Sequence, residues 1–178
     1  MKSVLVYCGS RSGNSDIYVK AAARLGELLA EKNYPLLFGG GNIGLMGALS
    51  NAMLDRGGQV LGVMPQRLID REIANRRCTE LRVVNSMQER KTLMEELADI
   101  IITLPGGYGS MDELFESLTN TQLGLHHKPV FILNTSGFYD PLIAQMDKMV
   151  EEGFLVKENR DKVQVAATPE ELMGMLPG

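Results

Sequence analysis

The residues best suited to chemistry are gathered in the stretch 104–113. An apolar run ends there and three glycines follow: Gly106, Gly107 and Gly109. Glycines let the backbone approach a ligand closely, and a helix that begins after them presents unpaired N–H groups and the positive end of its dipole. Ser110 can begin such a helix, and Glu113 adds a carboxylate. The pattern predicts a phosphate site with an acidic group close by.

Glu113 also has a purely structural interpretation. Ser110-x-x-Glu113 is a capping-box pattern, in which Ser110 is the N-cap and the glutamate reaches back to the Ser110 N–H. The local sequence leaves both interpretations open. A cap alone does not need three nearby glycines, whereas a phosphate cradle does.

Apolar runs alternate with amphipathic segments along the whole chain. We expect strands at 4–7, 35–38, 59–65, 81–84, 100–104, 130–133 and 163–165. We expect helices at 16–32, from the end of the glycine-rich stretch 39–47 to about Arg56, at 86–98, 110–123 and 138–152, and a last one from Pro169. This alternation predicts one α/β domain over 1–178, with a parallel sheet covered by helices on both faces.

Two more loops follow expected strands, at the sheet edge where open α/β folds bind ligands. The loop 8–15 offers Ser10, Arg11 and Asn14 as contacts, although an ordinary capped turn explains it equally well. The loop 39–47 contains several glycines, among them Gly39, Gly40, Gly41 and Gly44.

The second of these loops matches the dinucleotide fingerprint G-x-G-x-x-G at Gly39, Gly41 and Gly44. An NAD site also needs an acidic residue at the end of the next strand, and 59–65 ends without one. The chain contains no Gly-Lys-Ser/Thr, which excludes a P-loop NTPase. We therefore expect this loop to approach a mononucleotide.

Arg90 and Lys91 fall in the first turns of the helix expected at 86–98. Cations there face the positive end of the helix dipole, which is unfavourable unless an anion lies nearby. Ser86 and Glu89 form another capping box, so Glu89 is assigned a structural role. A nucleotide bound at the same edge of the sheet would supply the anion.

The composition narrows the class of protein. The 178 residues carry a formal net charge of −4 without a long basic run, which disfavours a nucleic-acid partner. Two cysteines, Cys8 and Cys78, without metal-ligand spacing indicate a reducing compartment. No window is apolar enough for a membrane span or a signal peptide, so we expect a cytoplasmic protein.

Two polar segments are assigned to the surface. The charged segment 66–80 is expected to be a solvated connection, with a flap or subunit contact as the alternative. His126 and His127 are expected to be solvated turn residues, because they have no cysteine or carboxylate at ligand spacing.

Four motifs together support a family resemblance. They are Gly39-Gly40-Gly41-x-x-Gly44-Leu45-Met46-Gly47, Met87-x-x-Arg90-Lys91, Pro105-Gly106-Gly107-x-Gly109-Ser110-x-x-Glu113, and Gln122-Leu123-Gly124 followed by Lys128-Pro129. In this order and spacing the chain resembles the LONELY GUY (LOG) family of cytokinin riboside 5'-monophosphate phosphoribohydrolases. The resemblance implies a Rossmann-like three-layer fold, a homodimer, and no metal or cofactor.

The resemblance also implies roles for individual residues. Arg90 and Glu113 would be the catalytic pair of an N-glycosidase that acts on adenosine-type nucleoside 5'-monophosphates. The residues expected to bind the substrate and its phosphate are Ser10, Gly40, Gly41, Gly44, Met87, Lys91, Gly106, Gly107, Gly109 and Ser110. Ser110 stands where the family usually has threonine, which keeps the hydroxyl group.

Two other functions remain as alternatives. A non-catalytic nucleotide or molybdenum-cofactor carrier could use the same loops, although it would have no use for a carboxylate beside the sugar. Lysine decarboxylase, a label often given to the family, usually requires pyridoxal phosphate on a lysine, and no lysine here is marked for that role.

Overall fold

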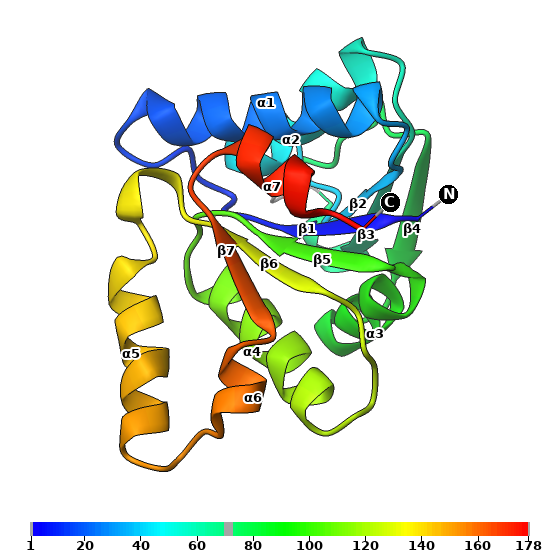
Figure 1. Ribbon diagram of the computed structural model, residues 1–178. Coiled ribbons are helices and arrows are strands. Elements are labelled where there is room, and N and C mark those ends of the chain that lie inside the picture. Colours follow the sequence, from blue (N-terminus) through cyan, green and yellow to red (C-terminus); the bar gives the residue numbers. More distant parts are fainter. Residues whose placement is uncertain (1, 70–72, 178) are drawn as a thin grey trace.

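The computed structural model describes residues 2–69 and 73–177, whose strands form one parallel sheet in the order β4-β3-β2-β1-β5-β6-β7 (Figure 1). The strands are β1 Val4–Tyr7, β2 Leu36–Phe38, β3 Val60–Pro65, β4 Glu80–Val84, β5 Ile100–Thr103, β6 Val130–Leu133 and β7 Val163–Ala166. The helices are α1 Asp16–Glu31, α2 Gly44–Asp55, α3 Met87–Leu97, α4 Tyr108–Gln122, α5 Asp140–Glu151, α6 Lys157–Arg160 and α7 Pro169–Met175. Two short 3-10 turns are η1 Gln66–Leu68 and η2 Thr135–Gly137.

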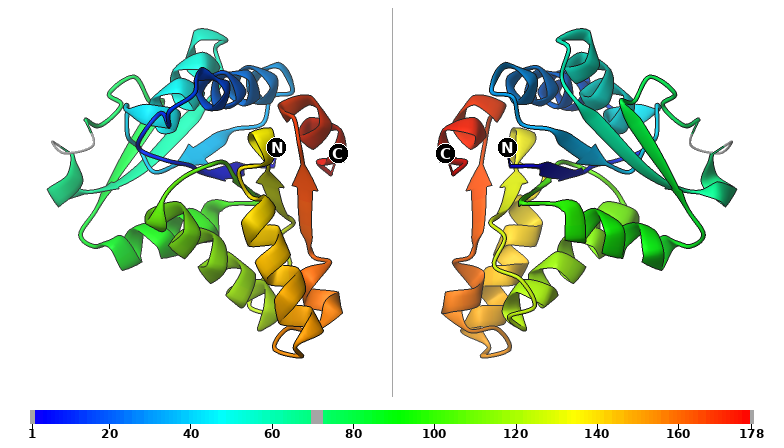
Figure 2. Two further views of the ribbon diagram at one scale, coloured as in Figure 1. Left: turned by 90° about the vertical axis from the view of Figure 1, so that its left-hand side faces the viewer. Right: turned by 90° about the vertical axis from the view of Figure 1, so that its right-hand side faces the viewer.

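The strand order reverses at β1, which pairs with β2 on one side and β5 on the other. Val4 lies opposite Leu36 in one neighbour and Ile100 in the other. The chain after β1 runs to α1, and the chain after β5 runs to α4 on the opposite face of the sheet (Figures 1 and 2). Such a switch point leaves a crevice at the carboxyl ends of the two strands.

Helices cover both faces of the sheet, as predicted. α1, α2 and α7 lie on one face, and α3, α4 and α5 lie on the other (Figures 1 and 2). Side chains of β1 alternate between the two cores: Val4 and Val6 pack on the first face, Leu5 and Tyr7 on the second. Because successive side chains of a strand point to opposite faces, one apolar run serves both layers. The expected three-layer α/β fold is confirmed.

Local capping signals mark several helix ends correctly. The Ser86 hydroxyl accepts from the Glu89 N–H at 3.0 Å, and the Thr168 hydroxyl accepts from the Glu171 N–H at 3.2 Å. Gly124 follows α4 with a φ of +73°, a conformation that suits glycine after a helix. No helix among the described residues is long and apolar enough to cross a membrane.

Part of the charged segment 66–80 is packed, which corrects the expectation of a solvated connection. Ala74 and Asn75 are buried, and the Asn75 N–H donates to the Gly40 carbonyl at 2.8 Å. A backbone bridge also joins Ala74 to Gly41, so this stretch extends the second glycine loop. Asp70, Arg71 and Glu72 lie outside the described residues.

The expectation for His126 is also wrong. Its Nε2 lies 3.0 Å from a Glu95 carboxylate oxygen and its Nδ1 lies 3.3 Å from the Thr121 hydroxyl. Thr121 lies 5 positions before His126 near the end of α4, whereas Glu95 lies 31 positions before it on α3 and meets it only in the fold. His127 is exposed, as expected.

Candidate active site

A cavity of about 410 Å³ opens at the strand switch point. Residues 6–13 at the end of β1 and residues 105–110 after β5 form much of its wall. Eight of the predicted site residues line it: Ser10, Met87, Arg90, Gly106, Gly107, Gly109, Ser110 and Glu113. The fold therefore brings together the expected catalytic pair and the 106–110 turn.

Helix α4 begins two residues earlier than the sequence suggested. Gly107 is its N-cap, in extended backbone and without a side-chain hydrogen bond, so Ser110 lies inside the first turn. The predicted Ser110 cap and its capping box with Glu113 are therefore wrong. The extended Gly107 begins the helix without a capping side chain, and the buried Ser110 packs back against Gly106.

This early start leaves the first turn of α4 without a side-chain cap at the cavity wall. Tyr108, Gly109 and Ser110 all line the cavity. The first N–H groups of a helix have no hydrogen-bond partner inside the helix itself. The helix is 15 residues long, so its dipole places a partial positive charge at this end. Phosphate is the ligand that such a helix end suits best.

Arg90 lines the cavity but is almost fully buried, with only 5% of its surface exposed. Its Nε donates to the Val63 carbonyl at 2.9 Å and its Nη2 donates to the Gly39 carbonyl at 2.5 Å. Main-chain carbonyls at the ends of β2 and within β3 therefore hold the guanidinium in one orientation. A fixed, desolvated cation in a cavity wall attracts an anion more strongly than one in water.

Glu113 faces the same cavity from the second turn of α4. Burial raises the pKa of both Tyr7 and Cys8, and the negative charge of Glu113 raises each pKa further. Tyr7 is the last residue of β1 and Cys8 follows it, so the Glu113 carboxylate lies close to the carboxyl end of this strand. The Tyr7 hydroxyl shares a 3.2 Å hydrogen bond with Ser117, one turn beyond Glu113 on α4.

The second glycine loop contributes less than the sequence suggested. Within the described chain Gly40, Gly41 and Gly44 do not line the cavity, although Gly39 does. The first turn of α2 is covered by the loop after β1, because the Leu45 N–H donates to the Gly9 carbonyl at 3.1 Å. A Cβ on Gly44 would lie less than 3.0 Å from the backbone of that loop. Gly44 therefore permits close packing of two loops, and substrate contact by these three glycines stays a prediction.

Lys91 likewise does not line the cavity formed by the described residues. Its ammonium lies 2.5 Å from Glu116 and 2.9 Å from Asp112, both on α4. These two carboxylates raise the pKa of Lys91. The side chain joins α3 to α4 beside the site, and direct substrate contact stays a prediction.

An apolar wall of the cavity was missed from sequence. It includes Tyr18 from α1 and Phe138 from the turn before α5, whose rings meet edge to face at 5.8 Å between centroids. The sequence placed Phe138 inside a helix, but α5 begins only at Asp140. Ser136 adopts a positive φ of 55° in this turn, and no local pattern predicted it.

Comparison with known proteins gives the family. The family described as "Possible lysine decarboxylase" matches residues 46–176. The rice protein (Oryza sativa subsp. japonica) named cytokinin riboside 5'-monophosphate phosphoribohydrolase LOG is 45% identical over 172 residues, which are 97% of this chain and 71% of that protein. The chain belongs to the LOG family.

A second LOG relative supports this membership. Cytokinin riboside 5'-monophosphate phosphoribohydrolase LOG2 of Arabidopsis thaliana is 44% identical over 175 residues, covering 98% of this chain and 82% of the relative. Among solved structures, the molybdenum cofactor binding protein of Rippkaea orientalis has a TM-score of 0.75 at 22% identity, covering 98% and 95% of the two chains. At that identity the likeness concerns the fold alone.

Proposed function

We propose that this LOG protein hydrolyses the N-glycosidic bond of adenosine-type nucleoside 5'-monophosphates, releasing the free base and ribose 5-phosphate. One observation carries the proposal: Arg90, Glu113 and the uncapped start of α4 line one cavity. The LOG relatives are named for this chemistry on cytokinin riboside 5'-monophosphates.

The phosphate is assigned to the start of α4. The N–H groups of Tyr108, Gly109 and Ser110, together with the helix dipole, suit its negative charge. Ser10 lines the same cavity and adds a hydroxyl donor. This anchor positions the ribose relative to the carboxylate of Glu113, further along the same helix.

Glu113 is assigned to the sugar. As the bond to the base breaks, positive oxocarbenium character develops on the ribose, which a carboxylate stabilises directly. The same group can orient the ribose hydroxyls or activate the attacking water. Proximity to Tyr7 and Cys8, both buried, keeps this charge in a region of low dielectric.

Arg90 is assigned to the negative charge that develops on the departing base, or to orienting the nucleotide. Because an arginine has a pKa above about 12, it is a poor proton donor and acts as a fixed cation. The apolar wall with Tyr18 and Phe138 provides a surface suited to the flat base. These assignments require neither a metal nor a cofactor.

Lysine decarboxylation is not supported by the lining of the cavity. That reaction usually needs pyridoxal phosphate joined to a lysine. None of the described residues that line the cavity is a lysine, and the nearby Lys91 is paired with Asp112 and Glu116.

The proposal is tested by measuring free base released from AMP and from isopentenyladenosine monophosphate, with wild-type protein, Glu113→Gln and Glu96→Gln. Glu96 is the control carboxylate, because it is exposed on α3 and lies outside the cavity lining. We expect Glu113→Gln to lower kcat by about 100-fold or more and Glu96→Gln to have a small effect. Wild-type protein that binds AMP without cleaving it would favour the carrier function, and full activity in Glu113→Gln would leave that residue without a catalytic role.

We also propose that the protein is a homodimer and that it is located in the cytoplasm. Homodimerisation is implied by the family, and the exposed Leu123 and Leu125 beyond α4 offer apolar surface for it. Two free thiols, Cys8 and Cys78, support a reducing, cytoplasmic location. Sedimentation velocity of the purified chain would test the dimer.

A further inference from the structure

Arg11 lines the cavity but takes no part in the assignments above. Within the described chain its side chain makes no hydrogen bond and no ion pair. Five other arginines are paired with carboxylates: Arg24, Arg56, Arg77, Arg82 and Arg160. Arg67 and Arg76 have no such partner among the described residues, but they do not line the cavity, whereas Arg11 does. An exposed guanidinium at a cavity wall, left without an internal partner, is a group available to a ligand.

We infer that Arg11 selects the 5'-phosphate of the substrate, acting as an exposed cation beside the start of α4. This inference rests on the proposed function, because it assigns a specificity-determining residue within the same site. It distinguishes nucleoside monophosphates from the corresponding nucleosides.

The backbone around Arg11 is held close to the phosphate turn. The Gly9 N–H donates to the Pro105 carbonyl at 3.1 Å, and a Cβ on Gly9 would lie 3.3 Å from the Gly106 Cα. On the other side, a Cβ on Gly44 would lie 2.5 Å from the Arg11 nitrogen. The main chain of this loop therefore packs between the start of α2 and the turn that precedes α4, while the Arg11 side chain is exposed.

The charges around the site give this cation a role. The protein has a net charge of −4, and the carboxylates of Asp112 and Glu113 also line the cavity, so both oppose the approach of a phosphate dianion to the start of α4. Arg90 lines the same cavity, but it is buried and fixed by the main-chain carbonyls of Val63 and Gly39. Arg11 adds a full positive charge in a planar fork that matches two phosphate oxygens.

The contact should act on binding and not on the chemical step. The phosphate keeps its charge and its bonds while the glycosidic bond breaks, so a contact with it is equally strong in the ground state and the transition state. Such uniform binding lowers KM and leaves kcat unchanged. A structural role for Arg11 would instead alter stability or both kinetic constants.

The experiment compares Arg11→Gln, Arg11→Lys and Arg76→Gln with wild-type protein. Arg76 is exposed and outside the cavity lining, so its variant controls for the loss of one charge. For Arg11→Gln we expect KM for AMP to rise about tenfold, with kcat within about twofold of wild type. Arg11→Lys should recover part of the loss, and Arg76→Gln should match wild type.

Calorimetric binding of AMP and adenosine separates this inference from the proposed function. Arg11→Gln should weaken AMP binding, leave adenosine binding unchanged, and reduce the salt dependence of AMP affinity. These binding data remain decisive even if the wild type binds AMP but hydrolyses none, an outcome that would overturn only the proposed function. Equal weakening of AMP and adenosine, unchanged AMP affinity in Arg11→Gln, or a wild type that does not prefer AMP would overturn the role of Arg11.

Discussion

Arg90 and Gly39 fit together as a pair. The guanidinium Nη2 donates to the Gly39 carbonyl at 2.5 Å, and a Cβ on Gly39 would lie less than 3.0 Å from that same nitrogen. The absence of a side chain at position 39 thus leaves the space that the buried guanidinium fills. This explains a glycine at the end of β2 without invoking a ligand.

The first prediction follows from that fit. Gly39→Ala should displace the Arg90 guanidinium and lower kcat by about 100-fold, since misplacement by about 1 Å is enough for such a loss. Steady-state hydrolysis of AMP is the measurement. A double-mutant cycle with Arg90→Ala provides the control. If Gly39→Ala acts through Arg90, the double variant should be no slower than Arg90→Ala, and fully additive losses would contradict the idea.

Gly109 tests the phosphate cradle. It lies in the first turn of α4, and a Cβ there would meet no atom of the described chain within 4 Å. Gly109→Ala should therefore keep the fold and raise the free energy of unfolding by up to about 1 kcal/mol, because alanine favours a helix more than glycine does. It should also raise KM for AMP, because the new methyl group would obstruct the phosphate.

The matched control for this prediction is Gly174→Ala in α7, where a new Cβ also meets open space. Thermal unfolding and AMP kinetics should be measured for both variants. The control should show the helix stabilisation with unchanged KM. Unchanged KM in Gly109→Ala as well would argue against phosphate at the start of α4.

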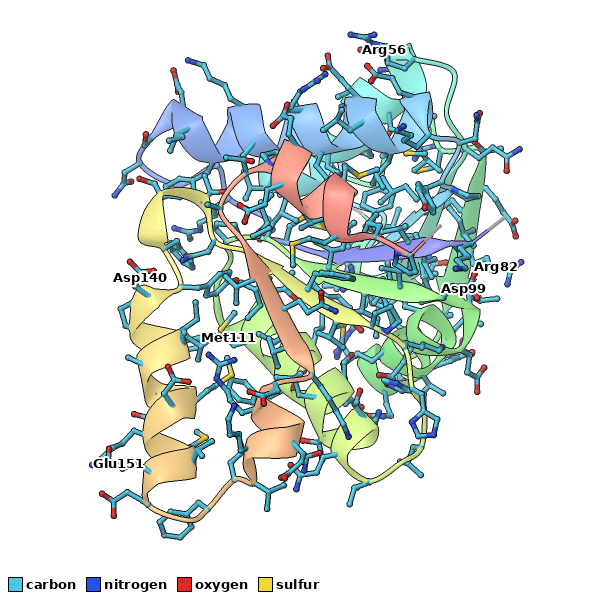
Figure 3. The ribbon with its side chains drawn as sticks, viewed as in Figure 1. Arg56, Arg82, Asp99, Met111, Asp140 and Glu151 are labelled. Atoms are coloured by element: carbon cyan, nitrogen blue, oxygen red, sulfur yellow. The ribbon has the colours of Figure 1, made fainter. Side chains whose placement is uncertain are left out.

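Asp99 lies at the opposite end of the molecule from Asp140 (Figure 3). Its carboxylate accepts the Ser3 N–H at 2.7 Å, and this bond lowers the Asp99 pKa from its ordinary value of 3.8. Since the unfolded chain then binds the proton more readily, the stabilisation is complete above that value. It is lost as the pH falls from 3.8 through the folded-state pKa.

Asp99→Asn should accordingly destabilise the protein at pH 7, by about 1 kcal/mol or less because the carboxylate is exposed. Urea unfolding of both proteins between pH 7 and pH 3 would measure the difference in free energy of unfolding. The difference should shrink toward acid pH. A constant difference across this range would mean that the charge of Asp99 is not involved.

The two thiols should differ in reactivity. Burial raises the pKa of Cys78 to about 11, and burial together with the charge of Glu113 raises the pKa of Cys8 as well. At pH 8 only about one Cys78 in a thousand is the reactive thiolate. A thiol reagent should label the native protein slowly, with the half-buried Cys78 ahead of the buried Cys8.

Cys8 lines the cavity and Cys78 does not, so AMP should slow only the labelling of Cys8. The variant Cys78→Ser isolates that signal. Labelling of Cys8 at the same rate with and without saturating AMP would mean that the nucleotide does not cover the end of β1.

Much of the fold was predictable because its signals are local. Apolar runs marked β1 and β6 with the bounds that the structure has, and the caps at Ser86 and Thr168 marked two helix starts. Helix α4 was misjudged because Ser110 and Glu113 copy a capping box, while the bare Gly107 that begins the helix carries no comparable signal.

The candidate site was predictable in part. The sequence showed an arginine at position 90 and a glutamate at position 113 as candidate catalytic residues, on helices that follow different strands. The partners of those residues were not visible, because Gly39 is 51 positions from Arg90 in sequence and meets it only across the sheet. Phe138 was missed for the same reason, since its place in the cavity depends on a turn with no local signature.

By itself the sequence determined the alternation of strands and helices, the family, and which residues carry charge or glycine freedom. These depend on side-chain type and short spacing, which a chain shows before it folds. Only the tertiary structure decided that Arg90 is buried against main-chain carbonyls, that Gly44 packs loops together, and that Arg11 remains unpaired beside the start of α4. Those relationships arise where the strand order reverses at β1, because that reversal brings distant loops to one crevice.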